Sequence, residues 1–508
     1  MFNSIKKNFS NSLNIIERVG NSLPHPATLF AILAFIVAIA SAIASNLDVT
    51  AVHPSDGSII SVKNLLSADG LRWIYTNIFK NFVEFPPLGI VLTAMIGIGI
   101  AEGTGLLSVL IKLVVLKAPK KLLTSTIIFA GIMSHTASEA GYVILIPLSA
   151  LVYLAVGRHP LAGLAAAFAG VSGGFGANFL IGSIDPVLAG LSQSAAQIID
   201  PDIHLNPAIN FYFMFVSGIL IVIVGTWVTE KIVEPRLGIY DGDVSVPAIE
   251  QITPIEKKGL IWAGVSIIIT TLILLILILP DGALLRNPST NSLIKSPFLD
   301  GMITAVMIFF FIPGLVYGIV VKNIKNDTDA IKHITKFFSS MASYIVLVFF
   351  AAQFVYFFRH SNLGIILAID GAELLKSLGL SGIPLIIAFV FLSAFINMFM
   401  GSASAKWAIM APVFVPMFML LGYHPALTQV AFRIGDSVTN IITPMMSYFA
   451  LIVTFAEKYK PNYGMGTIIT MMLPYTIFFL IGWIILLIIW LLLGIPLGPE
   501  GYLFYKNN

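Results

Sequence analysis

Two segments of this chain repeat the same pattern. Residues 140–172 align without gaps on residues 405–437, at a constant offset of 265 residues, and nine of the 33 positions are identical. A Gly-x-His-Pro segment occurs at 157–160 and again at 422–425, and a Gly-x-Ser segment occurs in both copies. Both copies are apolar but interrupted by Gly, Ser and Pro, as in membrane helices that break and expose backbone groups to ions or substrate. The repeat therefore predicts a secondary transporter.

Composition supports a membrane protein. Of the 508 residues, 57% are hydrophobic and 10% are charged, whereas a soluble domain has about 25% charged residues. The net charge is only +3, and the basic residues lie in short loops beside apolar runs, where they orient membrane proteins. We therefore expect a polytopic protein in the lipid bilayer and no nucleic-acid partner. The absence of Cys excludes disulfides and thiolate metal sites.

Long apolar runs predict the membrane-crossing helices, each of which needs about 20 residues. Nine runs are long enough: 26–46, 86–116, 161–192, 210–229, 259–279, 298–321, 338–358, 425–456 and 466–494. The first of them favours a spanning helix over a cleaved signal peptide, because the run is long and a long polar segment precedes it.

Two further pairs of apolar arms are shorter. They are 122–133 with 142–156, and 383–398 with 407–421, on either side of small polar tips. At about 1.5 Å per residue, such arms do not cross a bilayer. We interpret each pair as a re-entrant hairpin; two short tilted spans are the alternative. The prediction is an all-α membrane protein with nine transmembrane helices and two opposed re-entrant hairpins.

Basic residues predict the orientation. Segments 117–121, 230–258 and 322–336 carry three, four and four Lys or Arg residues, whereas 193–209 carries none. The first three are therefore expected in the cytoplasm. The number of crossings between the two copies is then odd, which predicts an inverted-topology repeat with hairpins that enter from opposite sides. The expected location is the inner membrane of a bacterium, with the N-terminus cytoplasmic and the C-terminus external.

The predicted spans divide the chain into four parts. These are an N-terminal span with an external loop, a first repeat with a hairpin and a broken helix, a scaffold with two spans and cytoplasmic loops, and a second repeat. Their bounds are 1–85, 86–229, 230–337 and 338–508, with the scaffold spans at 259–279 and 298–321.

Ionisable side chains in the apolar runs are the first candidates for function, because each costs about 2.5–3.5 kcal/mol on insertion scales. Asp185 follows a segment with five glycines, 170–184, where an unbroken helix is improbable. Arg433 and Asp436 are three residues apart, on one face of a helix. They predict either an anion-binding Arg beside an ion-coupling carboxylate, or a static ion pair that holds the bundle together.

Amides and hydroxyls extend this candidate site. Asn178 and Asn440 each lie near a helix break, where an amide oxygen suits a hard cation such as Na⁺ or simply satisfies the backbone. Ser404 and Trp407, at the second tip, are candidate substrate contacts, the Trp by stacking on a planar ring. Packing is the alternative for the aromatic residue.

Other polar residues are ambiguous. At the first tip, His135 and Glu139 either titrate, line the entry path or serve the structure, and Tyr142 is expected to pack. His159 and His424 follow a Gly and precede a Pro, which predicts turn or cap residues. A buried acid at Glu102 has no assigned role.

The sequence contains no constellation typical of an enzyme. It has no His-Glu-x-x-His, no Gly-x-x-x-x-Gly-Lys-Ser/Thr and no Cys nucleophile. We therefore expect no catalysis, no ATP-driven pumping and no tightly bound cofactor. The energy source is expected to be an ion gradient, of Na⁺ or H⁺, or the gradient of the substrate.

The chain resembles the AbgT family of p-aminobenzoyl-glutamate transporters almost from end to end. The segments that carry the resemblance are NSLPHPATLFAILA, VKNLLSADGLRWI, GRHPLAG, KIVEPRLG, SGIPLIIAF, APVFVPMFMLLGYHPALTQVAFRIGDS and YKPNYGMGT. The resemblance implies nine spans with two opposed hairpins, an inverted repeat and a bowl-like homodimer. It also implies transport of p-aminobenzoyl-glutamate, or export of sulfonamide-type antimetabolites, coupled to Na⁺ or H⁺.

The resemblance also implies site residues. Its functional positions fall on Asp185, Ser404, Trp407, Pro425, Arg433 and Asp436, and its polar ion and ligand positions on Asn178 and Asn397. A Na⁺ site would then take Asn178, Asn397 and Asp436, with Asn440 beside them. Many relatives have Asp where this chain has Glu139, and residues 437–444 vary among them, so ligand choice stays open.

Several functions remain compatible with these patterns. The favoured one is ion-coupled transport, by symport or antiport, of an aromatic carboxylate such as p-aminobenzoyl-glutamate. Arg433 would pair with a carboxylate and Trp407 would stack on the aminobenzoyl ring. The alternatives are a transporter of another di- or tricarboxylate on the same architecture, a passive channel, and a structural or receptor protein.

Overall fold

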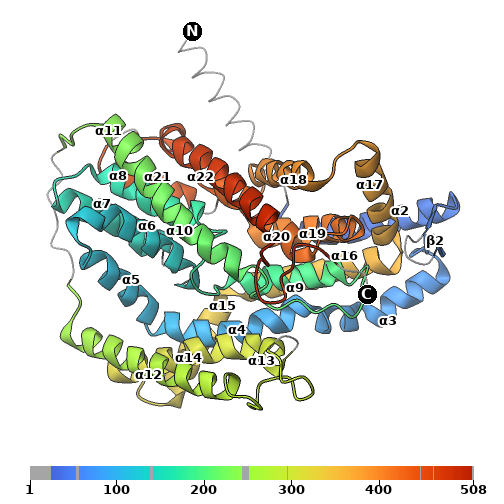
Figure 1. Ribbon diagram of the computed structural model, residues 1–508, viewed down its shortest axis with the longest axis horizontal. Helices are drawn as coiled ribbons and strands as arrows, with labels where there is room; N and C mark the ends of the chain where they lie inside the picture. The colour runs from blue at the N-terminus through green and yellow to red at the C-terminus, as the bar shows by residue number, and fades with distance from the viewer. Residues whose placement is uncertain are drawn as a thin grey trace, which may run out of the picture.

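The computed structural model describes residues 24–52, 57–137, 141–242, 251–293, 296–446, 448–460 and 463–505, and these are largely helical (Figure 1). The all-α prediction is confirmed. A small antiparallel pair of strands, β1 (Thr50–Val52) and β2 (Ile59–Ser61), follows the first long helix, α2 (Pro26–Asn46). Glu139 lies outside the described residues.

The two halves of the chain pass through the same order of helices. The first half contains α4 (Pro86–Gly103), α5 (Leu106–Leu116), α6 (Leu123–Met133), α7 (Ile146–Ala155), α8 (Pro160–Phe168), α9 (Ile184–Ala196) and α10 (Phe211–Val228). The second contains α16 (Ala342–His360), α17 (Leu363–Ser377), α18 (Gly382–Asn397), α19 (Ala403–Leu420), α20 (Pro425–Asn440), α21 (Phe449–Glu457) and α22 (Met465–Leu493). The repeated pattern in the sequence thus belongs to a longer structural correspondence.

The predicted run 86–116 is two helices rather than one. Gly105 has a left-handed conformation, with φ of 88°, between α4 and α5, and Asn362 does the same, with φ of 63°, between α16 and α17. The chain therefore changes direction at corresponding places in both halves. Helix α17 and helix α3 (Ala68–Val83) were not predicted, because charged residues such as Asp370, Glu373 and Lys80 interrupt their apolar runs.

Within the described residues, eight helical segments are long and apolar enough to cross a bilayer, judged by length and composition. The pair α17 and α18, which bends by 120° at its break, makes a ninth if it is a single span. Helix α19, which was predicted as a short arm, is one of the eight. The number of nine spans and the re-entrant hairpins remain predictions.

A scaffold lies along one edge of the molecule. Helices α12 (Pro254–Ile278) and α14 (Met302–Val320) pack together, and α14 packs on α4 (Figure 1). A Cβ at Gly97 would clash with the Met307 carbonyl, so this glycine permits the close contact between α4 and α14. The charged helix α15 (Asp327–Ser340) also packs on α4.

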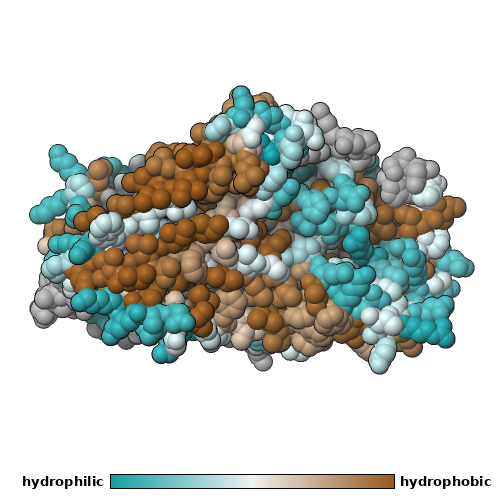
Figure 2. All heavy atoms as spheres, turned by 90° about the horizontal axis from the view of Figure 1, so that it is seen from below, coloured by the Kyte–Doolittle hydropathy of each residue, from teal (hydrophilic) through white to brown (hydrophobic). Residues whose placement is uncertain are grey.

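The outer surface is apolar over broad areas. Figure 2 shows bands of hydrophobic side chains, with hydrophilic residues gathered toward one end and along the edges. On α12, for example, Ile261, Ile268, Leu272 and Ile276 are exposed. Such a surface is stable against lipid rather than water.

The repeated Gly-x-His-Pro segments are helix ends, as predicted. Gly157 and Gly422 have left-handed conformations, with φ of 79° and 88°. His159 then caps α8 by accepting a hydrogen bond at Nδ1 from the Leu161 N–H at 3.2 Å, and His424 caps α20 from the Ala426 N–H at 3.2 Å. Each segment therefore ends one helix and starts the next within a few residues.

The repeated glycines at 170 and 435 let helices approach closely. A Cβ at Gly170 would lie 2.7 Å from the Ile128 carbonyl oxygen of α6, and a Cβ at Gly435 would clash with the Val390 carbonyl of α18. In each half, the glycine thus allows the segment that follows the Gly-x-His-Pro turn to pack closely against α6 or α18.

Candidate functional site

The two halves break their helices at different places relative to the candidate carboxylates. After α8 the chain forms one π-helical turn, Ala169–Gly173, and then runs irregularly until α9 begins at Ile184, so Asp185 lies in the first turn after a break. Helix α20 is intact as far as Asn440. Arg433 and Asp436 therefore lie on a continuous helix, and the predicted interruption comes after them.

Arg433 forms an ion pair with Asp185, which joins the two halves. Arg433 Nη1 lies 2.7 Å from Asp185 Oδ1, and the two side chains are only 4% and 1% exposed. Asp185 Oδ2 also accepts hydrogen bonds from the Gly182 N–H at 2.6 Å and from Asn178 Nδ2 at 3.2 Å. The irregular segment before α9 therefore supplies donors that hold this carboxylate toward α20.

Lys406 and Asp436 form a second buried ion pair. The Lys406 ammonium contacts both Asp436 Oδ1 and Asn397 Oδ1, and its side chain is fully buried. Asn440 Nδ2 donates to Asp436 Oδ2 at 3.3 Å, and Asn397 Nδ2 donates to the Asp436 carbonyl at 2.7 Å. Three helices, α18, α19 and α20, thus meet at this pair.

The alternative interpretation, an ion pair between Arg433 and Asp436, does not describe the pairs that form. Although the two residues are three apart on one helix, each finds its partner on a different helix: Asp185 on α9 and Lys406 on α19. The long-range packing of α9 and α19 against α20 places these partners closer than the neighbouring turn does.

The structure divides the proposed Na⁺ ligands between the two ion pairs. Asn178 contacts Asp185, whereas Asn397 and Asn440 surround Asp436. Lys406 occupies the oxygens of Asn397 and Asp436 that a cation would use. No cluster of three or more His, Cys, Asp or Glu residues able to hold a metal exists in the described part of the chain. A cation at Asp436 therefore has to displace the Lys406 ammonium.

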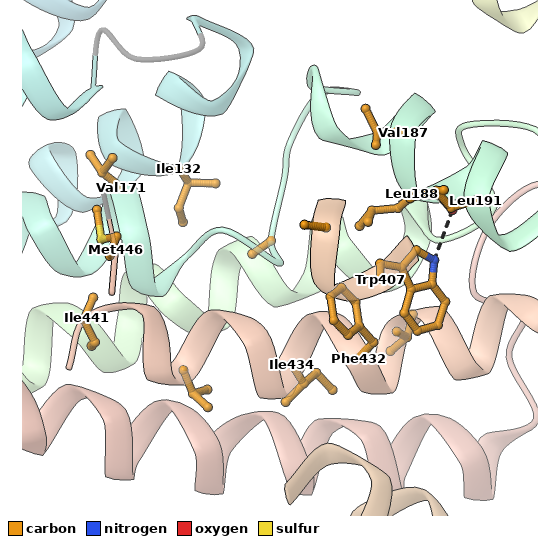
Figure 3. Close-up of a cluster of buried hydrophobic side chains, with 14 of the residues drawn as sticks. Ile132, Val171, Val187, Leu188, Leu191, Trp407, Phe432, Ile434, Ile441 and Met446 are labelled. Atoms are coloured by element: carbon orange, nitrogen blue, oxygen red, sulfur yellow. Dashed lines mark hydrogen bonds between the residues drawn. The ribbon is translucent and has the colours of Figure 1, made fainter. Parts of the chain in front are cut away.

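Trp407 lies in the interior, between α9 and α20. Its side chain is fully buried, and its ring centroid is 4.6 Å from that of Phe432 (Figure 3). The indole N–H lies 2.9 Å from Ser192 Oγ and 3.3 Å from the Leu188 carbonyl. The residue packs in this conformation, which was the alternative to substrate stacking, and stacking on a ligand requires the helices around it to move.

Two other predicted substrate contacts, Ser404 and Pro425, lie near the starts of α19 and α20. Ser404 is partly exposed, and its Oγ is 3.2 Å from Oγ of Ser402, the N-cap of α19. Pro425 is buried at the first position of α20. Ser404 is thus the more accessible of the two.

The first tip contacts the second half through aromatic rings. Tyr142 stacks on Tyr448, with ring centroids 4.5 Å apart, and this agrees with the packing role expected for it. His135 is buried with its ring edge toward Phe175, 5.2 Å away, and its Nε2 has no hydrogen-bond partner among the described residues. Glu102 lies at the end of α4, next to Gly103, which packs on α15.

Sequence reasoning missed three buried residues of this region: Lys406, Gln429 and Ser192. Lys406 lies within apolar sequence, and a Lys in such a position is itself a signal of function. Ser192 Oγ lies 2.7 Å from Gln429 Oε1, on two helices from different halves. No local pattern predicts that contact.

Comparison with known proteins agrees with this architecture. The model of the AbgT putative transporter family matches residues 11–505. The p-aminobenzoyl-glutamate transport protein of Escherichia coli K12 is 41% identical over 487 residues, which is 96% of each chain. The crystal structure of the YdaH transporter of Alcanivorax borkumensis has a TM-score of 0.89 at 46% identity, covering 94% of this chain and all of that one.

The structure of MtrF from Neisseria gonorrhoeae, described as illuminating a class of antimetabolite efflux pumps, has a TM-score of 0.91 at 49% identity. The match covers 96% of this chain and 99% of the MtrF chain. With matches of this extent, from the first predicted span to the last, the chain belongs to the AbgT transporter family.

Proposed function

We propose that this protein is an ion-coupled secondary transporter of p-aminobenzoyl-glutamate or a related aromatic folate-type metabolite. One observation supports it most: the Arg433 guanidinium is buried between the two halves and uses only Nη1, toward Asp185, while Nε and Nη2 make no hydrogen bond to the described residues. A planar guanidinium with free donors suits a carboxylate, which accepts two parallel hydrogen bonds. The E. coli relative is a p-aminobenzoyl-glutamate transport protein.

In this proposal the substrate competes with Asp185 for Arg433. A substrate carboxylate that binds the guanidinium weakens the ion pair joining α9 to α20, so binding changes the contact between the two halves. Alternating access then follows from movement of the hairpins and broken helices against the scaffold. Ser404, at the accessible end of α19, meets the substrate on its path. Trp407 stacks on the aminobenzoyl ring once Phe432 moves aside, while its indole N–H stays on Ser192.

The coupling ion acts at Asp436 in the same proposal. A proton neutralises the Asp436 carboxylate, and a Na⁺ replaces the Lys406 ammonium on the oxygens of Asp436 and Asn397, so either ion releases Lys406. Both therefore free α19 from α20. Asp436 and Asn397 fit either ion. Uptake measured under separately imposed Na⁺ and pH gradients distinguishes the two.

Orientation and assembly complete the proposal. The Lys and Arg residues at 117–121, 230–258 and 322–336 support a cytoplasmic N-terminus and an external C-terminus in the bacterial inner membrane. The resemblance to the family supports a homodimer. Cysteine labelling from each side of intact cells tests the orientation, and cross-linking in membranes tests the dimer.

The test is transport by purified protein in liposomes. We expect accumulation of p-aminobenzoyl-glutamate only under an imposed Na⁺ or pH gradient, and competition by this ligand rather than by succinate or citrate. Arg433→Lys should abolish accumulation of the ligand, because Lys lacks the planar guanidinium that donates two parallel hydrogen bonds to a carboxylate. Arg158→Lys is the matched control, since Arg158 pairs with Glu230 and Glu234 at another place.

Other outcomes decide for the alternatives. Competition by succinate or citrate would assign the protein to another di- or tricarboxylate. Flux that persists without any gradient and never concentrates the ligand would indicate a passive channel. Export of sulfonamide antimetabolites is a second candidate function, favoured by the similarity to MtrF, and loading such compounds inside the liposomes tests it.

A further inference from the structure

A chain of hydrogen bonds beside the first ion pair fixes the orientation of one buried amide. The Trp407 indole N–H is only a donor, so Ser192 Oγ, 2.9 Å away, accepts its hydrogen bond. The Ser192 hydroxyl then donates to Gln429 Oε1 at 2.7 Å. The carbonyl end of the Gln429 amide therefore faces Ser192, and its NH₂ group is directed to another side.

That NH₂ group has no acceptor within the described part of the chain. Gln429 is fully buried, and its Nε2 makes no hydrogen bond there. Buried donors without acceptors are unfavourable, and native proteins rarely keep them without a reason. An acceptor supplied by a bound ligand would satisfy this donor.

Gln429 and Arg433 are four residues apart on α20, which puts them on the same face of the helix, one turn apart. Arg433 Nε and Nη2 are likewise buried and without hydrogen-bond partners among the described residues. One face of α20 thus carries two successive groups of N–H donors, and Asp185 pairs only with Nη1 of the second group.

We propose that Gln429 is a specificity-determining residue that donates to an acceptor oxygen of the substrate next to the carboxylate bound by Arg433. This inference rests on the proposed function. An N-acyl amino acid carries such a pair of neighbouring acceptors, the carbonyl of its amide and its carboxylate, whereas a simple aromatic acid or an alkylated amino acid does not. The site thus selects acylated amino acids. Ser192 and Trp407 position the Gln429 amide that donates to the acyl carbonyl.

The experiment compares a ligand that has this carbonyl with one that lacks it. The benzyl compound also has a protonated amine in place of the neutral amide, so each variant is compared with the wild type for the same ligand. Binding of p-aminobenzoyl-glutamate and of N-(4-aminobenzyl)glutamate, in which CH₂ replaces the carbonyl, is measured by calorimetry on the purified full-length protein. The wild type should bind the benzoyl compound more tightly. Gln429→Met should lower the affinity for the benzoyl compound by about tenfold, the effect of one lost hydrogen bond, and leave the affinity for the benzyl compound unchanged.

Two further variants complete the design. Ser192→Ala leaves the Gln429 amide in place but removes the hydroxyl that orients it, so it should weaken binding of the benzoyl compound more than binding of the benzyl compound, and less than Gln429→Met does. It keeps the test valid if Gln429→Met does not fold. Gln353→Met is the matched control, because Gln353 is a buried amide already paired with Asn81 at 3.0 Å and with the Ile78 carbonyl. It should leave the ratio of the two affinities unchanged.

Equal weakening of both ligands by Gln429→Met would show a purely structural role, and an unchanged affinity for the benzoyl compound would show no role at all; either result overturns the inference while the proposed function stands. A wild-type protein that binds neither ligand overturns both.

Discussion

The buried ion pair between Lys406 and Asp436 predicts how much stability the protein loses when either partner is replaced. Lys406→Met removes the only cation paired with Asp436 among the described residues and leaves a carboxylate that is 2% exposed. Breaking a buried ion pair from one side costs about 3–5 kcal/mol. Asp436→Asn, which leaves the ammonium unpaired, should cost a similar amount.

The double variant Lys406→Met/Asp436→Asn distinguishes pairing from general damage. It leaves no buried charge, so it should be more stable than either single variant, with a coupling energy of about 3 kcal/mol. The free energy of unfolding is measured in mixed micelles by denaturant titration followed by tryptophan fluorescence. If the double variant loses the sum of the two single losses, Lys406 and Asp436 do not stabilise each other and the reasoning about the site fails.

Asp436→Asn should abolish concentrative uptake in liposomes while equilibrium binding of p-aminobenzoyl-glutamate survives, and normal accumulation would refute its coupling role. Trp407→Ala should weaken ligand binding by about 1–3 kcal/mol and Trp407→Phe, which keeps a ring but loses the N–H to Ser192, should weaken it less; equal affinities in all three proteins would exclude ring stacking. Gly435→Ala should lower the thermal unfolding temperature, because the new Cβ clashes with the Val390 carbonyl. Gly264→Ala is the control and should not lower it, since nothing lies within 4 Å of its new Cβ. A similar small effect of both substitutions would mean that α18 and α20 do not pack so closely.

Local features of the fold could be predicted from the sequence. The Gly-x-His-Pro segments predicted helix ends at 157–160 and 422–425, because a left-handed glycine, a histidine cap and a first-turn proline each act within a few residues. The apolar runs and the scarcity of charge predicted an all-α membrane protein, since only helices satisfy backbone groups within a single segment in lipid. The choice of Asp185, Arg433 and Asp436 followed from the cost of burying charge.

Ion pairs and hydrogen bonds between distant parts of the chain could not be predicted from the sequence. Spacing along one helix allowed an ion pair between Arg433 and Asp436, yet Arg433 pairs with Asp185 and Asp436 pairs with Lys406. The same holds for Gln429, whose amide is oriented by Ser192 from the other half. Residue type and spacing express what a segment can do alone, but the partner of a buried charge depends on which helices pack side by side, and that packing is a property of the whole chain.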